Sequence, residues 1–439
     1  MDIVSFIHEM TWDCLSPRVR RQAVRCLLDS LGASIGGRAT ELSRIIHDFA
    51  AAAFGGRGAR LWQDGREVSP PGAALANGMT IDALDIHDGH SLTKGHAGAA
   101  IVPATLAMLA SGGQPVSGQE CLMLIAIGYE VAIRAGIALH ASASDYHSSG
   151  SWNALGAAAV VARRLKLNQE QTLHALGVAE YHGPRSQMMR CIDDPTMVKD
   201  GSGWGAMAGV SAALLAAAGF TGAPAVTADA SALGKQWNDL GERWEILSQY
   251  FKPHAVCRWA QPAVEGAVLL QRRHDLRHDE ITAIHIDTFH EATRLTNRAP
   301  TSTEEAQYSL SFPVAAVLVH GEMGAAALMG AALSDPRVLR LAASVKVVQS
   351  REFDREFPAR RLANVTIETT DGRRLEVHRV EPRWDGASPP ADEELIAKFR
   401  GLTASLPLDQ SQSIEKTVLN LAELPDARVL ADLMATPCG

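Results

Sequence analysis

Apolar residues recur every three or four positions over most of the first 270 residues of the chain. After Ser16-Pro17, which joins a capping residue to a proline suited to the first helical position, apolar side chains keep this spacing until Gly32. The other segments whose spacing predicts helices are 69–79, 101–110, 119–139, 152–165, 168–181 and 204–218. The pattern therefore predicts a large helical domain over residues 1–270.

The pattern changes after about residue 275, where apolar and polar residues begin to alternate. Residues 281–288 alternate with a period of two, which is typical of a half-buried strand. Residues 363–368 and 374–380 flank an Asp371-Gly372 turn, the sequence of a tight β-hairpin. The helical segments predicted between these strands are 304–320 and 324–333.

We therefore expect a mainly α fold with an α+β part. Residues 275–400 form the smaller α+β domain, and residues 1–270 form the helical domain. Helical spacing returns at 414–433. The C-terminal segment 405–439 is accordingly predicted to pack back on the helical domain, so that both ends of the chain build it.

The composition is that of a soluble globular protein, with 439 residues of which 46% are hydrophobic and 21% charged. A net charge of -8 disfavours a nucleic-acid partner, because no basic stripe is available for phosphates. The six cysteines contain no C-x-x-C pair, which argues against structural zinc or an iron–sulfur cluster. The N-terminus lacks the features of a signal peptide, and the best apolar run, 206–220, is too short to span a membrane. We expect a cytoplasmic protein with no membrane partner.

The densest group of ionisable residues lies between two helical segments, at 82–100. Its first 15 residues contain three histidines, three aspartates and one lysine, and unpaired charges are costly to bury among packed helices. Further polar loops lie at 145–151, 182–185, 193–201 and 251–258. Side chains of these loops that could bind or protonate a substrate are Asp85, Asp88, His96, His147, Lys199, Lys252 and Arg258. Lysine and arginine anchor carboxylates while histidine, lysine and aspartate transfer protons, so this set suits an anionic substrate.

The stretch Asp85–Pro103 resembles the signature of the MmgE/PrpD family, which includes 2-methylcitrate dehydratase, cis-aconitate decarboxylase and iminodisuccinate epimerase. The resemblance continues through 146–159, 197–199, 251–258, 304–310 and 363–377, and so covers nearly the whole chain. It implies a helical domain made of both chain ends, an α+β lid domain, a homodimer, and an active site between the domains that needs no cofactor. The family's site, carried over to this sequence, falls on Asp85, His96, His147, Lys199 and Lys252.

Some positions depart from the pattern of the family's decarboxylase and dehydratase members. Gly89 stands where these members carry a threonine, and Phe312 where a tyrosine is common. Cys257 stands where the decarboxylase has a histidine, and the loop Asp88–His96 is one residue longer. These departures predict a divergent member with its own substrate.

The residue types and the resemblance lead to a mechanistic hypothesis. The residues expected to bind the small-molecule carboxylate substrate are Asp88, Arg185, Lys252, Cys257 and Arg258. His147 or Lys199 removes a proton α to a carboxylate, and nearby cations stabilise the carbanion. His96 then acts as the general acid, while Asp85 orients a histidine or lysine. The predicted function is that of a lyase acting on a di- or tricarboxylate by elimination, similar to 2-methylcitrate dehydratase.

Three alternatives stay open. An epimerase of an imino- or amino-dicarboxylate would exchange a proton with solvent without losing mass. A metal-dependent hydrolase would draw ligands from the histidines and aspartates of 85–96, but His90-x5-His96 is not a zincin spacing and Lys94 between them opposes a cation. A non-enzymatic binding protein could keep the same fold.

Overall fold

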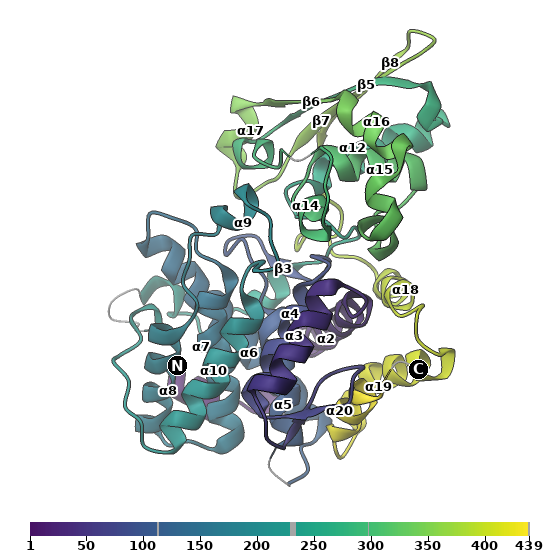
Figure 1. Ribbon diagram of the computed structural model, residues 1–439. Helices are drawn as coiled ribbons and strands as arrows, with labels where there is room; N and C mark the ends of the chain where they lie inside the picture. The colour runs from purple at the N-terminus through teal and green to yellow at the C-terminus, as the bar shows by residue number, and fades with distance from the viewer. Residues whose placement is uncertain (112–113, 229–233, 297, 438–439) are drawn as a thin grey trace.

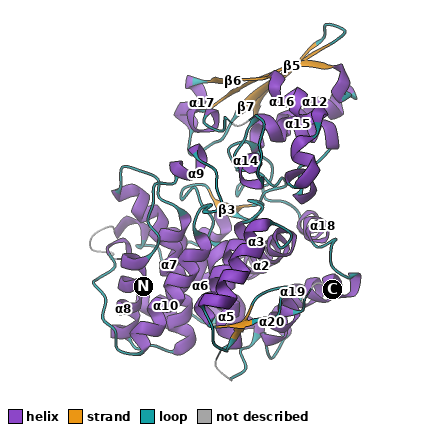
Figure 2. Cartoon of the chain, viewed as in Figure 1, coloured by secondary structure: helices purple, strands orange, loops and turns teal. Residues whose placement is uncertain are grey.

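The computed structural model describes residues 1–111, 114–228, 234–296 and 298–437, so Cys438 lies outside the described residues. Helices dominate the chain. In the view of Figure 1 a mainly helical part lies below and a part that contains the main sheet lies above, and Figure 2 shows the strands of that sheet in the upper part. The expectation of a mainly α fold with a smaller β component is confirmed.

The helical part is built from the first half of the chain and from its C-terminal segment. Its helices are α1 (Ile3–Glu9), α2 (Pro17–Gly37), α3 (Glu41–Ala53), α4 (Pro70–Asp82), α5 (Gly98–Ala110), α6 (Gly118–Ser142), α7 (Ser149–Leu165), α8 (Gln169–His182), α9 (Met189–Asp193), α10 (Ser202–Ala217), α18 (Asp392–Leu402), α19 (Leu408–Leu419) and α20 (Arg428–Ala435). Helices α4, α5, α7 and α10 pack against one another. A Cβ atom at Gly209 would lie 2.3 Å from the carbonyl oxygen of Ala154, so glycine is what lets α10 approach α7 this closely.

Helix α6 forms the centre of this core. Among the described residues it is the helix whose length and hydropathy would allow it to cross a membrane, but 94% of the apolar window is buried inside the protein. This helix, rather than 206–220, is therefore the longest apolar segment. Its Glu130 and Arg134 pair on one face at 2.6 Å, with both side chains fully buried. Their four-residue spacing places the two side chains on one face of the helix, and the pair lies inside the core.

The C-terminal helices return to the first helices of the chain. Helices α18 and α19 contact α2, and α20 contacts α5. From α18, the ammonium group of Lys398 donates to Asp29 of α2 at 2.5 Å and to the carbonyl oxygen of Ile86 at 2.6 Å. The contacts with the first helices thus begin at α18 (Asp392–Leu402), ahead of the segment 405–439.

The α+β part contains a four-stranded sheet in the order β6–β5–β7–β8, in which β6 is parallel to β5 and the other pairs are antiparallel. Its elements are α12 (Gln261–His274), β5 (Ile281–Thr288), α13 (His290–Thr293), α14 (Thr303–Gln307), α15 (Ser311–His320), α16 (Pro336–Ser344), β6 (Val345–Gln349), α17 (Arg351–Glu356), β7 (Ala363–Thr369) and β8 (Arg374–Val380). Helices α12 and α16 contact the sheet, and α15 contacts both helices. Because α12 packs on β7 and β8, this part begins near residue 261 and not at 275.

The predicted strand β5 and the hairpin β7–β8 are confirmed, whereas β6 was not expected from the sequence. The predicted helix 304–320 is two helices, α14 and α15, because the backbone turns between them. There the N–H of Leu310 bonds to Leu295 outside either helix, and the hydroxyl of Ser309 accepts from the N–H of Phe312 at 3.0 Å. The segment 324–333 forms short 3₁₀ turns in place of an α-helix.

Two short strands join the parts at the polar loops. Strand β3 (Gly89–His90) pairs antiparallel with β4 (Gln249–Tyr250). A separate pair, β1 (Ala59–Arg60) with β2 (Glu67–Val68), lies in the helical part. The β3–β4 pairing places the loop between α4 and α5 directly against the segment that leads into α12.

Candidate active site

A cavity of about 420 Å³, including space open to solvent, lies where the two parts meet. Its walls come from the loop between α4 and α5, from α9 and the loop after it, from the segment between β4 and α12, from the end of α14 and from the residues before β7. The lining residues are Asp85, Lys94, His96, Met188, Cys191, Ile192, Asp200, Tyr250, Cys257, Arg258, Trp259, Tyr308 and Arg361. Five distant stretches of sequence thus meet in one small hollow.

Asp85 and Lys252 form the central ion pair of the site. The Nζ of Lys252 lies 2.7 Å from Oδ1 of Asp85, and both side chains are buried. Burial alone would raise the pKa of Asp85, but the ammonium groups of Lys252 and Lys199 outweigh it and hold that pKa below its usual value. Asp85 is therefore a carboxylate at neutral pH, and its left-handed backbone, with φ of 48°, turns it into the site.

His96 stands beside this pair with a fixed tautomer. Its Nδ1 lies 2.6 Å from the backbone carbonyl oxygen of Asp88, which can only accept, so Nδ1 carries the proton. The other nitrogen, Nε2, lies 3.7 Å from Oδ1 of Asp85. Burial, with the nearby ammonium group of Lys252, lowers the pKa of His96 to about 3. The neutral imidazole therefore offers a lone pair at Nε2 and, in this state, carries no proton there to donate.

Lys199 joins the helical part to the α+β part. Its ammonium group donates to the side-chain oxygen of Gln307 at the end of α14, and lies 4.8 Å from the ring centre of Tyr308. The amide nitrogen of Gln307 in turn donates to the carbonyl oxygen of Ala83 at 2.8 Å. Burial raises the pKa of Tyr308 well above its usual value, so its phenol keeps its proton. We name Asp85, His96, Lys199 and Lys252 the acid–base cluster.

Asp200 supports the backbone of His96 through Ser149. The backbone N–H of Ser149 donates to Asp200 at 3.0 Å, the Ser149 hydroxyl bonds to the same carboxyl group, and its oxygen accepts from the N–H of His96 at 3.0 Å. Burial and the neighbouring carboxyl group of Asp82 raise the pKa of Asp200 to about 8. Asp200 is thus mostly protonated at neutral pH and does not add a negative charge to the cavity.

Three further cations line the cavity. Arg258 is held by backbone carbonyl groups, by Asp385 at 3.2 Å, and by the ring of Tyr250. Lys94 and Arg361, which we name the cation pair, have no carboxylate partner among the residues that the structure describes. The Nη2 of Arg361 donates to the carbonyl oxygen of Ser91 at 3.1 Å, and the ammonium group of Lys94 lies over the ring of Tyr146.

Of the expected site residues, the structure places Asp85, His96, Cys257 and Arg258 at the cavity wall. Lys252 and Lys199 lie behind that wall, Lys252 bonded to Asp85 and Lys199 over the ring of Tyr308. The other expected residues do not line the cavity. Asp88 is fully buried behind the loop, among Tyr129, Cys26 and Asp29, and only its backbone carbonyl serves the site through His96. The Asp88 side chain therefore does not line the cavity, although it was expected to bind substrate.

His147 and Arg185 also lie away from the cavity wall. The backbone N–H of His147 donates to Nε2 of His140, and its chain pairs with Gln187 in a single β-bridge. Arg185 is exposed, and its charge acts on the pKa of His147 and not on the acid–base cluster. The structure therefore does not place His147, the expected catalytic base, or Arg185, the expected clamp, among the lining residues.

The two departures from the family pattern have structural explanations. A Cβ atom at Gly89 would lie 2.4 Å from the hydroxyl oxygen of Tyr250 and 2.8 Å from Nδ1 of His96, so that position has no room for a larger residue. Tyr250 supplies a hydroxyl where a side chain at residue 89 would project. Phe312 is fully buried in α15 and does not line the cavity, whereas Tyr308 does.

Within the part of the chain that the structure describes, one group of side chains could supply donors to a metal ion. Ligand atoms of Asp82, Asp85 and His87 lie within 4.8 Å of one another, and all three residues are buried. Asp85 already holds the ammonium group of Lys252, so a cation there would compete with that lysine. His90 pairs with Glu245 at 3.4 Å, away from that group. The five residues expected of a metal-dependent hydrolase therefore do not converge on one point.

The sequence hypothesis did not include Tyr250, Tyr308, Asp200, Lys94 and Arg361 as site residues. Tyr250 immediately precedes a loop that was singled out, and Asp200 lies within another, so proximity in sequence was a usable signal. Arg361 carries no such signal. Its neighbour in the sequence, Arg360, is a surface residue with two glutamate partners, so proximity to Arg360 does not point to a site. Only the packing of the segment before β7 against Ser91 brings Arg361 to the cavity.

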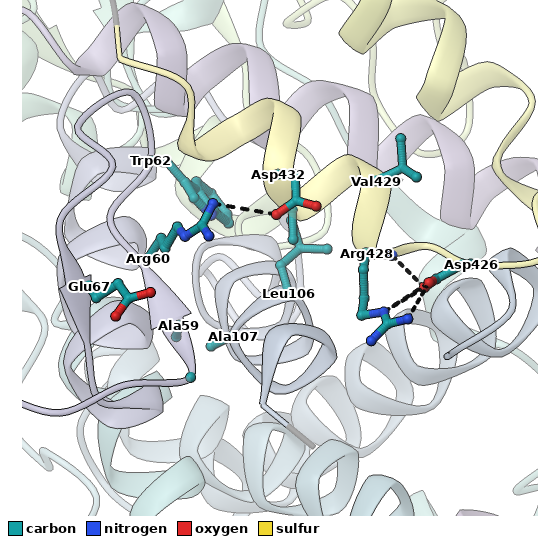
Figure 3. Close-up of a pocket in the computed structure, with 12 residues that line it drawn as sticks. Ala59, Arg60, Trp62, Glu67, Leu106, Ala107, Asp426, Arg428, Val429 and Asp432 are labelled. Carbon is teal, nitrogen blue, oxygen red and sulfur yellow. Dashed lines mark hydrogen bonds and ion pairs between the residues drawn. The ribbon is translucent and has the colours of Figure 1, made fainter. Parts of the chain in front are cut away.

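A second cavity, of about 940 Å³ with its open space, lies between β1, α5 and α20 (Figure 3). Two ion pairs lie among its lining residues: Arg60 faces Asp432 at 3.5 Å, and Arg428 binds Asp426 at 2.6 Å. The first pair is largely exposed and the second is partly exposed. The site at the junction of the two parts differs, because it gathers buried cations in excess of carboxylates.

Comparison with known proteins assigns the family. The MmgE/PrpD N-terminal domain matches residues 1–240, and the MmgE/PrpD C-terminal domain matches residues 254–423. The cis-aconitate decarboxylase-like protein oryM of Aspergillus oryzae is 24% identical over 482 residues, which cover 99% of this chain and 96% of that protein. The cis-aconitate decarboxylase of Aspergillus terreus is 24% identical over 475 residues, covering 99% of this chain and 96% of that protein. The cis-aconitate decarboxylase of Homo sapiens is 24% identical over 466 residues, covering 98% and 93%. Because both family domains match in order along the chain, the protein belongs to the MmgE/PrpD family.

Proposed function

We propose that the protein is a lyase that acts on a small di- or tricarboxylate, removing a proton α to a carboxylate and eliminating a hydroxyl group as water. The observation that carries the proposal is the neutral His96, whose unprotonated Nε2 stands beside Asp85 and two buried ammonium groups. The relatives are named as decarboxylases of cis-aconitate, which supports lyase chemistry on a carboxylate.

The first step of the proposed reaction is proton removal. His96 accepts the proton at Nε2, and the electrons of the broken C–H bond move toward the adjacent carboxylate. Lys252 and Lys199 stabilise the negative charge that develops there, because preorganised cations in a buried site act strongly on developing charge. Asp85 then stabilises the imidazolium form of His96 from 3.7 Å.

The second step is loss of the hydroxyl group. Tyr308 donates its proton to the leaving oxygen, the C–O bond breaks, a C=C bond forms and water departs. Lys199, 4.8 Å from the ring centre of Tyr308, stabilises the phenolate. Transfer of the proton from His96 to Tyr308 restores both groups, so the cycle needs no other reactant.

Decarboxylation is the second candidate, and the names of the relatives favour it. In that reaction a C–C bond to a carboxylate breaks, carbon dioxide leaves, and a carbon atom of the substrate takes up a proton. The same cations would bind the substrate, and Tyr308 would be the proton donor. His96 in its neutral form has no role as an acid there, which is why we rank elimination first.

The test is incubation of the purified protein with citrate, 2-methylcitrate, cis-aconitate, malate and iminodisuccinate in D₂O, followed by mass spectrometry. Loss of water from one substrate is the expected result. Loss of carbon dioxide would select the second candidate. Deuterium uptake without loss of mass would identify an epimerase, and silence across the panel by folded protein would contradict lyase activity on this class.

We also propose that a second copy of the chain covers the outer face of α10. This helix contains no charged residue, and its Trp204 is 38% exposed next to Phe49 of α3, which is 43% exposed. Apolar patches of this kind mark interaction surfaces in soluble proteins. Sedimentation analysis should find a homodimer that Trp204→Glu dissociates. A monomeric wild-type protein would overturn this.

A further inference from the structure

The chemistry proposed above does not use the cation pair. Arg361 is 3% exposed, and its Nη1 and Nη2 donate to the carbonyl oxygens of Pro358 and Ser91. Its Nε–H is buried without a hydrogen-bond partner. A buried charge without a counterion is strongly unfavourable, and a guanidinium group offers donors that match a carboxylate. Arg361 therefore has an unfilled capacity for an anion at the cavity wall.

Lys94 has the same deficit. Its ammonium group is half-buried and donates to the carbonyl oxygen of Leu92 at 3.2 Å, while the ring of Tyr146 lies 4.0 Å away. Burial and the charge of Arg361 lower its pKa to about 8, while Glu291, which forms no ion pair with Lys94 in the described structure, acts in the opposite direction. An anion placed between them would relieve this repulsion.

The loop that carries Lys94 is built to present it. Lys94 has a left-handed backbone with φ of 53°. The next residue, Gly95, has no space for a side chain, because a Cβ there would lie 2.1 Å from the hydroxyl oxygen of Ser149. Lys94 belongs to the loop that is one residue longer than in the family pattern. It is therefore a feature of this chain and a candidate for what distinguishes its substrate.

The two cations come from different parts of the molecule. Lys94 lies in the loop between α4 and α5, and Arg361 lies just before β7. Arg258, in the same cavity, already has Asp385 as its counterion. The acid–base cluster supplies Lys199 and Lys252 near the reacting carbon. A carboxylate bound by the cation pair is therefore a different carboxylate of the substrate.

We propose that Lys94 and Arg361 together bind a carboxylate that does not take part in the reaction, so that the cavity selects substrates with at least two carboxylates, and tricarboxylates above all. This proposal deepens the proposed function and rests on it in one respect, since only turnover makes the bound carboxylate a substrate. The binding itself is independent of turnover. The subsite also ties the two parts of the molecule together, since the anion contacts one cation from each.

The experiment is calorimetric titration with tricarballylate, a tricarboxylate without a leaving group, and with glutarate, a dicarboxylate of similar length without the central carboxylate. Wild-type protein should bind tricarballylate more tightly. Lys94→Met and Arg361→Gln should each weaken tricarballylate binding by about 10- to 100-fold, the range for loss of a charge-assisted hydrogen bond, and reduce the preference over glutarate. Arg361→Lys should keep part of the affinity.

Two matched variants serve as controls. Lys166 also has a left-handed backbone, with φ of 54°, but it is exposed and does not line this cavity, so Lys166→Met should bind as wild type. Arg360→Gln removes the neighbouring, exposed arginine and should also leave binding unchanged. Unchanged affinity in Lys94→Met and Arg361→Gln, or no binding of tricarballylate by wild type, would overturn the proposal. A preference that is lost in both variants while no carboxylate is turned over would sustain the subsite and defeat only the lyase function.

Discussion

The acid–base cluster and the cation pair meet at one cavity, but they differ in their partners. The cluster contains a carboxylate: Lys252 holds Asp85, Asp85 faces His96, and Lys199 donates to the neutral side-chain oxygen of Gln307. In the cation pair, Lys94 and Arg361 hold only carbonyl oxygens and aromatic rings.

The difference separates two tasks. Partners within the protein fix the position and protonation of groups that react, and they must be present before substrate arrives. Cations without a carboxylate partner in the protein are neutralised by an anionic group of the ligand. They therefore indicate which charged groups the ligand must carry. On this view the cluster performs chemistry that the family shares, and the cation pair determines which carboxylate this member accepts.

The largest effect should follow from His96→Asn. Asparagine can keep the donor to the carbonyl oxygen of Asp88 but removes the acceptor at Nε2. The turnover number should fall by about 10² to 10⁴, the range for a general base, while the melting temperature changes little. Steady-state kinetics and thermal unfolding check this together. Turnover within a few fold of wild type would remove His96 from the mechanism.

Lys252→Met should have the next largest effect, which is a loss of folding stability. It leaves Asp85 buried without its partner at 2.7 Å, and breaking a buried pair in this way costs about 3–5 kcal/mol. Chemical denaturation measures the loss. Asp85→Asn with Lys252→Met removes both charges and should recover part of it.

The pH dependence of this loss has a definite sign. In wild type the pKa of Asp85 is depressed, so its pairing contributes stability at neutral pH that is lost as the pH falls toward that pKa. Lys252→Met removes this contribution. The gap between variant and wild type should therefore be widest near neutral pH and shrink in acid. A gap that is constant with pH would show that lost packing, not charge, is the cause.

Gly89→Ala tests whether the hydroxyl of Tyr250 occupies the space that a side chain at residue 89 would need. The added Cβ would lie 2.4 Å from that hydroxyl, and overpacking of this kind costs about 1–3 kcal/mol. Tyr250→Phe removes the obstructing oxygen, so the double variant should be more stable than Gly89→Ala alone. Equal stability of the two would contradict the geometric account.

The smallest effect concerns pH and the cation pair. The pKa of Lys94 lies at about 8, so its charge fades as the pH rises past that value. The groups that face it are Arg361, Tyr146, His140 and Glu291. The KM for a tricarboxylate should rise several-fold between pH 7 and about 9. Lys94→Arg, which stays charged, should flatten this rise, and an equal rise in both proteins would refute the assignment.

The helical core and the β-hairpin could be predicted from the sequence, because their signals are local. The spacing of α2 and α6, and the Asp371-Gly372 turn, specify those elements almost independently of context. The break between α14 and α15 was not predictable, because the backbone N–H of Leu310 turns to Leu295, a contact set by tertiary packing. Strand β6 depends in the same way on its parallel partner β5.

The candidate site also contains features that the sequence could predict and features that it could not. Asp85, His96, Lys199 and Lys252 could be named from the sequence because they lie in polar stretches that carry the family resemblance. Their roles could not, since the tautomer of His96 is set by a backbone carbonyl eight residues away. His147 was a reasonable candidate by type, but nothing in the sequence shows that it bonds to His140 and not to the cavity.

The most direct test of this division is to measure kcat and KM separately for His96→Asn and Arg361→Gln on the carboxylate that wild type turns over. The account predicts that His96→Asn lowers kcat at least about 10²-fold with little change in KM, and that Arg361→Gln raises KM with little change in kcat. The reverse assignment, or equal losses of kcat in both variants, would contradict it.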